Sequence, residues 1–339
     1  MKRYLTFIAL VAFMLGLVPV GPFSVVQAQT KIKLTQPVDS LTFFPIYVGR
    51  ELGYFKDEGI DLEVIATAGG GPHLQAVIAG QAQFTASPGT YQLNALKRGK
   101  QVLGIFNILK RNIIGLVIHV DVAKKLGITE KTPFKEKLKK IKGLTLGVTR
   151  PGALTYIMAE DLILRAGYVP NKDVRILAVG GGATIVPALK TKKVDIMFIS
   201  TPHPERAISG GFGQWFINNA QGEDPTMPEF MMSALMVSPE YAEKNSDIVK
   251  KMVRAMRRSV KYITTHPLND SVKAVKSFFG KKVSTKVLSE AVRTVKATVA
   301  EDGRMSQRAV NITVDIMKKG GMLKRDYRLN EVFTDKYLK

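Results

Sequence analysis

The sequence contains no cysteine in 339 residues. Such a chain forms no disulfide, presents no thiol nucleophile and binds no metal through thiolates. It also cannot carry the lipid anchor of a bacterial lipoprotein, which is attached to a cysteine. Closely spaced histidine pairs and aspartate-rich loops, the patterns typical of zinc and calcium sites, are missing as well. We therefore expect no metal in this protein.

Nucleotide-binding and catalytic motifs are also missing, although the triple-glycine runs at 69–71 and 180–182 invite comparison with phosphate loops. A phosphate loop carries a Lys-Ser/Thr pair after its last glycine, and neither run is followed by one. The dinucleotide fingerprint is incomplete too, because its third glycine and the acidic residue after the next strand are lacking. The four histidines lie outside any serine elbow or paired-carboxylate motif. We expect no cofactor and no enzymatic activity.

Acidic residues are few compared with basic ones: 28 Asp and Glu stand against 50 Lys and Arg, which gives a net charge of +22 at pH 7. The basic runs at 135–142, 250–258 and 280–282 are far apart along the chain, and no nucleic-acid-binding motif accompanies them. We interpret these runs as solvated surface and expect no nucleic-acid partner. An excess of basic over acidic residues this large also favours a small anionic ligand.

Residues 1–28 have the pattern of a secretory signal peptide. Two basic residues precede an apolar run from Leu5 to Val18, and Val26-Gln27-Ala28 fits a cleavage site. The apolar run is shorter than the ~20 residues that a membrane span needs. We expect the signal to be cleaved and the mature chain, which has no lipoprotein cysteine, to be free in the periplasm.

Strand and helix patterns alternate along the rest of the chain, which is typical of α/β lobes with largely parallel sheets. Residues 43–55 have the pattern of a helix, with Pro45 in its first turn and Gly53 at its end. The order strand, triple glycine, helix, strand occurs at 61–86 and again at 174–202. We interpret this as an internal repeat with one copy in each of two lobes. From Pro239 onward, apolar residues at three- and four-residue spacing predict mostly helices.

Four segments are placed where open α/β sheets bind ligands, at the expected carboxyl ends of strands. A helix that begins there presents unpaired N–H groups with partial positive charge. Several such helix starts facing one crevice could hold an anion without a dedicated charged side chain. The candidate segments are Gly69–Pro72, Ser87–Thr90, Thr149–Thr155 and Gly181–Thr184.

The stretch "GYFKDEGIDLEV" at 53–64 resembles the opening of periplasmic solute-binding proteins of the SsuA/TauA/NMT1-THI5-like family. The segments 302–323 and 330–339 are similar to that family's C-terminal end, so the resemblance covers nearly the whole mature chain. One departure is Gln83, where the family often has an aspartate. The motif is specific for the family but does not identify the ligand.

The resemblance implies a type II periplasmic binding fold, an α/β architecture of two lobes with a ligand cleft between them. By analogy, lobe 1 comprises residues 29–115 and 212–339, lobe 2 comprises 116–211, and Trp215 would lie in a hinge segment. Arg150, which precedes a Pro-Gly helix start, is the expected charged contact. The candidate ligand-lining residues are Ser40, Phe43, Phe44, Gly70, Gly71, Ser87 and Thr90 in lobe 1, and Thr149, Arg150, Gly152, Ala153 and Thr201 in lobe 2.

The resemblance further implies a receptor for an ABC importer. Such a receptor is a monomer that captures a small anionic organic solute (a sulfonate, nitrate-like anion, carboxylate or pyrimidine) and docks transiently on a permease in the inner membrane. The alternatives are a TAXI-type receptor of a TRAP transporter, a pyrimidine-related enzyme on the same fold, and a sensor that reports to a membrane kinase. The missing catalytic residues count against the enzyme.

Overall fold

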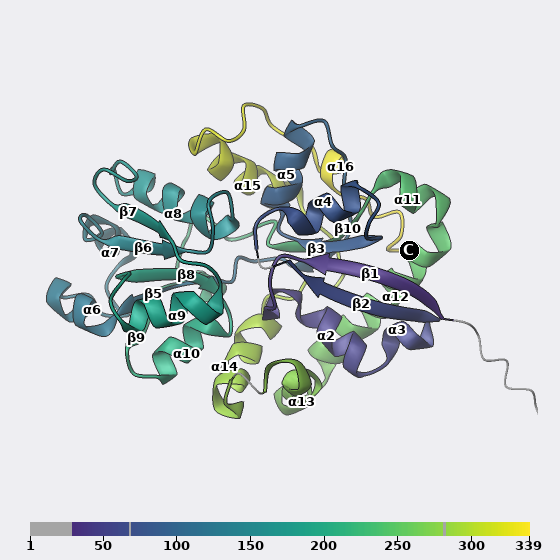
Figure 1. Ribbon diagram of the computed structural model, residues 1–339, viewed down its shortest axis with the longest axis horizontal. Coiled ribbons are helices and arrows are strands. Elements are labelled where there is room, and N and C mark those ends of the chain that lie inside the picture. The colour runs from purple at the N-terminus through teal and green to yellow at the C-terminus, as the bar shows by residue number, and fades with distance from the viewer. Residues whose placement is uncertain (1–28, 68, 281–282) are drawn as a thin grey trace, which may run out of the picture.

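The computed structural model describes residues 29–67, 69–280 and 283–339. The expected signal peptide lies outside these residues. Two α/β lobes stand side by side, each built around a mixed five-stranded sheet (Figure 1). No helix in the described part of the chain has the length and apolar character to cross a membrane.

The first sheet has the strand order β2-β1-β3-β10-β4. Alternating polar and apolar residues bury one face of β1, which pairs in parallel with β2 along its whole length, from Thr30 opposite Ile60 to Gln36 opposite Ala66. β10 comes from much later in the sequence and runs antiparallel between β3 and β4. The strands are β1 (Thr30–Gln36), β2 (Ile60–Ala66), β3 (Phe84–Ser87), β4 (Leu103–Leu109) and β10 (Ser233–Val237).

The second sheet has the order β7-β6-β8-β5-β9. Its strands are β5 (Ile114–His119), β6 (Thr145–Val148), β7 (Arg175–Ala178), β8 (Ile196–Ser200) and β9 (Gly213–Asn218). β6 pairs in parallel with β7 and β8, whereas β5 runs antiparallel to β8 and β9. Both sheets are therefore mixed rather than largely parallel.

The predicted internal repeat corresponds to equivalent positions in the two sheets. β1 is the second strand of its sheet, between β2 and β3. β6 is likewise the second strand of the other sheet, between β7 and β8. The helix that connects β2 to β3, α4 (Pro72–Ile78), begins after Gly71, and the helix that connects β7 to β8, α9 (Gly182–Lys190), begins after Gly181. Both glycine-rich loops thus lie at carboxyl ends of strands, as expected.

The boundary expected at residue 211 does not coincide with the sheets. β9 lies beyond it, yet its hydrogen bonds to β5 place it in the second sheet. Trp215 is consequently part of a strand rather than of a hinge. Its ring packs on Gly115 of β5, where an added Cβ would come within 2.6 Å of the indole. The chain passes between the sheets at residues 110–113 and 219–232.

Helices cover both faces of the sheets (Figure 1). Pro45 lies in the first turn of α2, and Gly53 beyond its end has the left-handed φ of +73° that was expected. The first lobe carries η1 (Leu41–Phe43), α2 (Phe44–Glu51), α3 (Tyr54–Asp57), α4, α5 (Gly89–Lys97), α11 (Pro239–Lys244), α12 (Ser246–Thr265), α13 (Leu268–Phe279) and α16 (Leu329–Val332). The second carries α6 (Val120–Leu126), α7 (Phe134–Lys139), α8 (Leu154–Arg165), α9, α10 (His203–Ser209) and η2 (Asn219–Gln221).

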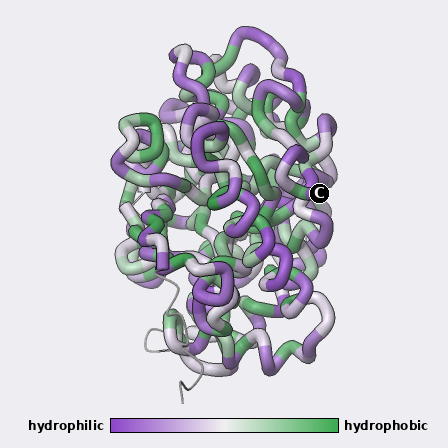
Figure 2. Tube along the Cα trace, turned by 90° about the vertical axis from the view of Figure 1, so that its right-hand side faces the viewer, coloured by the Kyte–Doolittle hydropathy of each residue, from purple (hydrophilic) through white to green (hydrophobic). Residues whose placement is uncertain are grey.

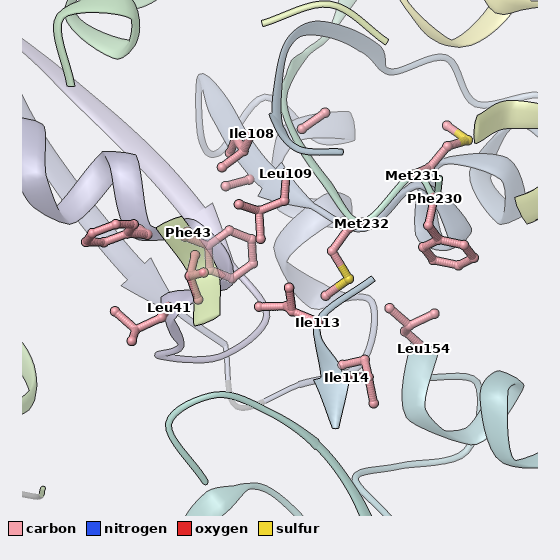
Figure 3. Packing of buried hydrophobic residues seen from close by; sticks show 14 of the residues in the cluster. Leu41, Phe43, Ile108, Leu109, Ile113, Ile114, Leu154, Phe230, Met231 and Met232 are labelled. Carbon is pink, nitrogen blue, oxygen red and sulfur yellow. The ribbon is translucent and has the colours of Figure 1, made fainter. Parts of the chain in front are cut away.

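Two C-terminal helices contact both lobes. α14 (Thr285–Lys296) packs against η1 and against α10, and α15 (Gln307–Lys319) packs against α5 and α8. In Figure 2, hydrophilic and hydrophobic segments are interspersed along the whole trace. One apolar cluster of buried side chains continues from lobe to lobe, and Figure 3 shows Phe43, Met232 and Leu154 near the point where the chain passes between the lobes. The apolar core therefore extends up to the line where the lobes meet.

Candidate solute-binding cleft

A cavity of about 60 Å³ lies where the two sheets face each other. The first lobe supplies the segments that follow β1 and β3, and the second supplies those that follow β6 and β8, so the carboxyl ends of parallel strands converge here as predicted. We call this space the inner cavity. It is lined by Pro37, Val38, Thr42, Phe43, Gly69, Pro88, Tyr91 and Met232 of the first lobe, and by Ile114, Thr149, Ala153, Leu154, Thr155, Ile199 and Ser200 of the second.

The lining of the inner cavity is mostly apolar, and its polar side chains are hydroxyls. Thr149 and Thr155 bond to each other, with 2.8 Å between their Oγ1 atoms. The Thr149 N–H also donates to Thr155 Oγ1 at 3.0 Å. These bonds join the end of β6 to the first turn of α8. The wall is thus closed by internal hydrogen bonds and carries no charged side chain of its own.

Direct contacts hold the lobes together beside the inner cavity. Ser40 caps η1 by accepting a hydrogen bond from the Thr42 N–H, and its Oγ lies 2.8 Å from Ser200 Oγ at the end of β8. The Leu41 N–H donates to the Thr201 carbonyl at 3.4 Å. A segment of the first lobe therefore binds the end of a strand of the second lobe, through both backbone and side chain.

Arg150 lies at the mouth of the inner cavity, across from the first glycine run. A Cβ placed on Gly69, which has a φ of +89°, would come 3.7 Å from Arg150 Cδ. The guanidinium is exposed, and its charge acts on Tyr91, which lines the cavity. Burial raises the pKa of Tyr91 to about 12, so the phenol stays protonated. The charge that Arg150 brings to the cavity mouth is therefore positive and solvated.

The twelve residues expected to contact a ligand separate into two groups. Phe43, Thr149 and Ala153 line the inner cavity, and Ser40 and Arg150 lie beside it. Of the others, Phe44 is fully buried in the core of the first lobe, because consecutive residues at a helix start point in different directions. Gly70, Gly71 and Gly152 belong to the glycine-containing turns, and Ser87, Thr90 and Thr201 are buried behind the wall.

His73 supports the wall from behind. The first turn of α4 buries it completely, where its Nε2 lies 2.8 Å from Ser87 Oγ and its ring meets Tyr91 edge-on at 4.8 Å. Burial lowers the pKa of His73 to about 4, so the imidazole is neutral at physiological pH. The sequence showed only that the histidines lie outside catalytic motifs and gave no sign of this role of His73. It could have been found only through the contact with Ser87 and Tyr91, which lie 14 and 18 positions later.

A second, larger space of about 650 Å³ adjoins the inner cavity, with which it shares Val38, Ile199 and Ser200 as walls. We call it the outer chamber. Its walls again come from both lobes: Val38, Asp39, Ala66, Phe279 and Val283 from the first, and Gly182, Ala183, Ile199, Ser200, Pro202, His203 and Arg206 from the second. The second glycine run, predicted as part of a ligand site, therefore faces this chamber.

Near the outer chamber, α10 carries a buried carboxyl group. Glu205 is 7% exposed, and within the described residues neither of its carboxyl oxygens has a hydrogen-bond partner. Burial, together with a smaller contribution from repulsion by Glu290 on α14, raises the pKa of Glu205 to about 7. Since α10 belongs to the second lobe and α14 packs on the first, Glu205 lies where the lobes meet.

In the described part of the chain, no three His, Asp or Glu side chains lie close enough together to bind a metal ion. The cleft consists of the inner cavity and the outer chamber, both bounded by the two lobes. Hydroxyl groups line the inner cavity, Arg150 lies at its mouth, and Arg206 lines the outer chamber. Among the described residues, the cleft shows no catalytic constellation. Such a site suits capture of a small molecule.

Two lobes of this strand order, with a cleft at the carboxyl ends of their strands, define a periplasmic binding protein fold. The periplasmic nitrate-binding protein NrtA from Synechocystis PCC 6803 has a TM-score of 0.73 at 15% identity, over 91% of this chain and 87% of that one. The alkanesulfonate-binding protein SsuA from Xanthomonas axonopodis pv. citri, bound to MOPS, has a TM-score of 0.69 at 12% identity, over 91% and 99%.

A comparison of the sequence with family models identifies the family of this chain. The chain belongs to the NMT1/THI5-like family, whose model matches residues 40–270. Among curated proteins it is similar to YtlA of Bacillus subtilis (strain 168), whose name describes a binding protein, with 21% identity over 307 residues. That match covers 89% of this chain and 87% of YtlA. The expected family and fold are confirmed.

Proposed function

We propose that this protein is the extracytoplasmic solute-binding receptor of an ABC importer, which captures a small anionic organic solute when its lobes close. The observation that carries the proposal is the inner cavity, walled by both lobes, which the bond between Ser40 and Ser200 joins beside it. A site assembled from two lobes favours the closed form when it is occupied, because only that form makes all the contacts.

The family and the fold support this reading. NrtA and SsuA are named for binding nitrate and alkanesulfonate, and both share the two-lobed architecture. The positive Arg150 at the cavity mouth and the net charge of +22 favour an anion over a cation. We propose further that the protein is exported to the periplasm by cleavage after residue 28, and that it acts as a monomer on an inner-membrane permease.

A thermal-shift screen of the mature chain tests the receptor function, with sulfonates, carboxylates, nitrate, pyrimidines and amino acids as separate classes. A solute at 100 times its Kd stabilises the folded form by about 2.7 kcal/mol. Small-angle X-ray scattering on the same samples reports lobe closure. Stabilisation by one class together with compaction is expected. If no class stabilises the chain at any concentration, the receptor function is wrong.

Reconstitution identifies the transporter. With its solute, an ABC receptor stimulates ATP hydrolysis by the permease encoded beside it, whereas a TRAP-type receptor has no ATPase partner. Stimulation that requires both protein and solute is the expected result. Solute turnover by the isolated chain would instead support the enzyme alternative.

A further inference from the structure

The parallel strands of the second lobe begin at the end of the lobe that faces away from the cleft. β6 and β8 start there, at Thr145 and Ile196, and their carboxyl ends reach the inner cavity. Four residues in β6 and five in β8, at 3.3 Å each, separate this outer end from the cavity by roughly 13–17 Å. Figure 1 shows the outer end at the left, with α6 and α7, on the side opposite the first lobe.

Hydrogen bonds join the segments that form this outer end. The Asp195 N–H, just before β8, donates to the Thr145 carbonyl at the start of β6, at 2.9 Å. The Gly143 N–H donates to the Asp173 carbonyl at 2.8 Å. Lys140 Nζ donates to a carbonyl at the end of α6, at 2.7 Å. One continuous surface is therefore built from the segments 119–126, 139–145, 171–175 and 190–195.

These four segments carry ten Lys and Arg against three Asp. Nine of the ten basic side chains are exposed. Among the described residues, only Lys142 and Lys192 of these nine pair with an acid. We call the nine side chains the basic cap: Lys124, Lys125, Lys139, Lys142, Lys172, Arg175, Lys190, Lys192 and Lys193.

The first lobe differs at the equivalent place. The segments 56–59 and 79–83 precede β2 and β3, as two segments of the cap precede β7 and β8. The charged residues of these two segments are Lys56, Asp57 and Glu58. Both acids pair with arginines of α12. The basic cap therefore belongs to one copy of the internal repeat and does not simply follow from the high net charge.

The composition of the cap favours an extended anionic surface over a discrete anion. All but one of its cations are lysines, which act as point charges, whereas the planar fork of arginine suits single phosphates and carboxylates. Nucleic-acid binding also uses free aromatic faces for base stacking. Two rings beside the cap, Tyr168 and Phe212, lie instead under its lysines, with Lys142 and Lys190 Nζ 5.9 and 6.0 Å from the ring centroids.

We propose that the basic cap binds the anionic surface of a phospholipid bilayer, which holds the protein reversibly at a membrane. Each lysine close to such a surface contributes ~5-fold to binding, and added salt weakens the attraction. The cleft lies at the other end of the strands, so solute can still enter it. The proposal goes beyond the receptor function and does not depend on the identity of the solute.

Vesicle co-sedimentation of the full mature chain tests the lipid partner. The vesicles contain phosphatidylcholine alone or phosphatidylcholine mixed with anionic phosphatidylglycerol. We expect binding to the mixed vesicles only, and a binding constant that falls as salt is added. No binding to the mixed vesicles at low ionic strength, or equal binding to both kinds, overturns the proposal. Release by inorganic phosphate, but not by chloride of the same ionic strength, would indicate a discrete anion site and also overturn it.

Variants test the cap itself. The triple variant Lys124→Gln, Lys172→Gln and Lys193→Gln should bind the mixed vesicles ~10-fold or more weakly than the wild type. A control triple, with the same loss of charge on exposed lysines of the first lobe, should bind nearly as the wild type does: Lys56→Gln, Lys100→Gln and Lys261→Gln. Melting curves confirm that both fold. Equal weakening by the two triples would overturn the proposal, as would a cap triple that loses binding to single-stranded DNA but not to vesicles.

Discussion

The hydroxyl oxygens of Ser40 and Ser200 lie 2.8 Å apart, although 160 positions separate the two residues in the sequence. The first follows β1 of one lobe and the second ends β8 of the other. Because the lobes cannot separate without breaking this bond, it contributes directly to the balance between open and closed forms.

Ser200→Ala should shift that balance toward the open form. The substitution removes the hydroxyl–hydroxyl bond between the lobes but leaves the bond from Leu41 to Thr201 and the capping of η1 by Ser40. A net hydrogen bond contributes about 1 kcal/mol, or about fivefold in the equilibrium. Distances between spin labels on the two lobes measure the populations. Ser277→Ala, which removes a bond to Glu51 within the first lobe, is the control. An unchanged distance distribution in Ser200→Ala would show that the bond does not control closure.

Arg150→Ala should reduce affinity for anionic solutes and leave affinity for neutral ones nearly unaltered. Arg150 is the charged side chain at the mouth of the inner cavity and reaches Gly69 across the cleft. The expected loss for an anion is ~10-fold at low ionic strength, decreasing with added salt because the group is exposed. Calorimetric titration at two salt concentrations measures it. Equal losses for anionic and neutral solutes would point to a packing role instead.

Gly182→Ala should destabilise the chain by about 1–3 kcal/mol, because the new methyl group would overlap the His203 ring. Gly181→Ala is a matched control one position earlier, where an added Cβ meets nothing within 4 Å and φ is −81°. Urea denaturation compares the two. The double variant Gly182→Ala with His203→Ala should recover most of the loss. A Gly182→Ala variant as stable as Gly181→Ala contradicts the packing argument.

The buried carboxyl of Glu205 should make the folded chain less stable as pH rises. Burial raises the pKa from 4.5 to about 7, so between these values the folded state retains a proton that the unfolded state has lost. Stability is then greatest below pH 4.5 and declines up to about pH 7, by about 3 kcal/mol at most. Glu205→Gln should remove this contribution, so that its free energy of unfolding rises with pH relative to that of the wild type. Denaturation curves between pH 4 and 8 test it, and parallel profiles for both proteins would contradict it.

His73 should produce the opposite trend. Burial lowers its pKa from 6.5 to about 4, so the unfolded chain takes up a proton in this range while the folded chain does not. The contribution of the neutral His73 imidazole to the free energy of unfolding is complete above pH 6.5 and declines as the pH falls toward 4. In the wild type the two trends offset each other over most of this range. His73→Gln should therefore show stability that falls with rising pH, and Glu205→Gln stability that rises. If neither variant differs from the wild type in slope, both assignments fail.

Local patterns in the sequence were enough to predict the helix ends and the two-lobed arrangement that surround the site. Pro45, Gly53 and the two glycine runs have strong conformational preferences of their own, and the structure places them at the predicted helix ends. Alternation of polar and apolar residues identified β1, whereas β3, β6 and β8 are buried along nearly their whole length and show no such alternation. The family motif then indicated two lobes with a cleft between them.

The details of the site depend on contacts that no local pattern records. Ser200, Tyr91 and Met232 meet in the inner cavity from three distant stretches of the chain. Phe43 and Phe44 are chemically equivalent in the sequence and both belong to the buried core, but only Phe43 also borders the inner cavity, because the two side chains point in different directions at the start of α2.

The glycine-rich stretch around Trp215 suggested a hinge. Gly115 and Gly213 instead allow β5 and β9 to pack closely with their neighbours, so these glycines serve a strand rather than a bend.

The position of β10 determines the order in which the lobes can be completed during synthesis. β3 and β4 follow each other in the sequence but do not pair, because β10 lies between them and is made more than 120 positions after β4. The second sheet needs only the continuous stretch from Ile114 to Asn218. As the chain emerges, the inserted lobe has all of its strands while the first lobe still lacks β10, the strand that joins β4 to the rest of its sheet. The lobe that begins the chain is therefore finished last.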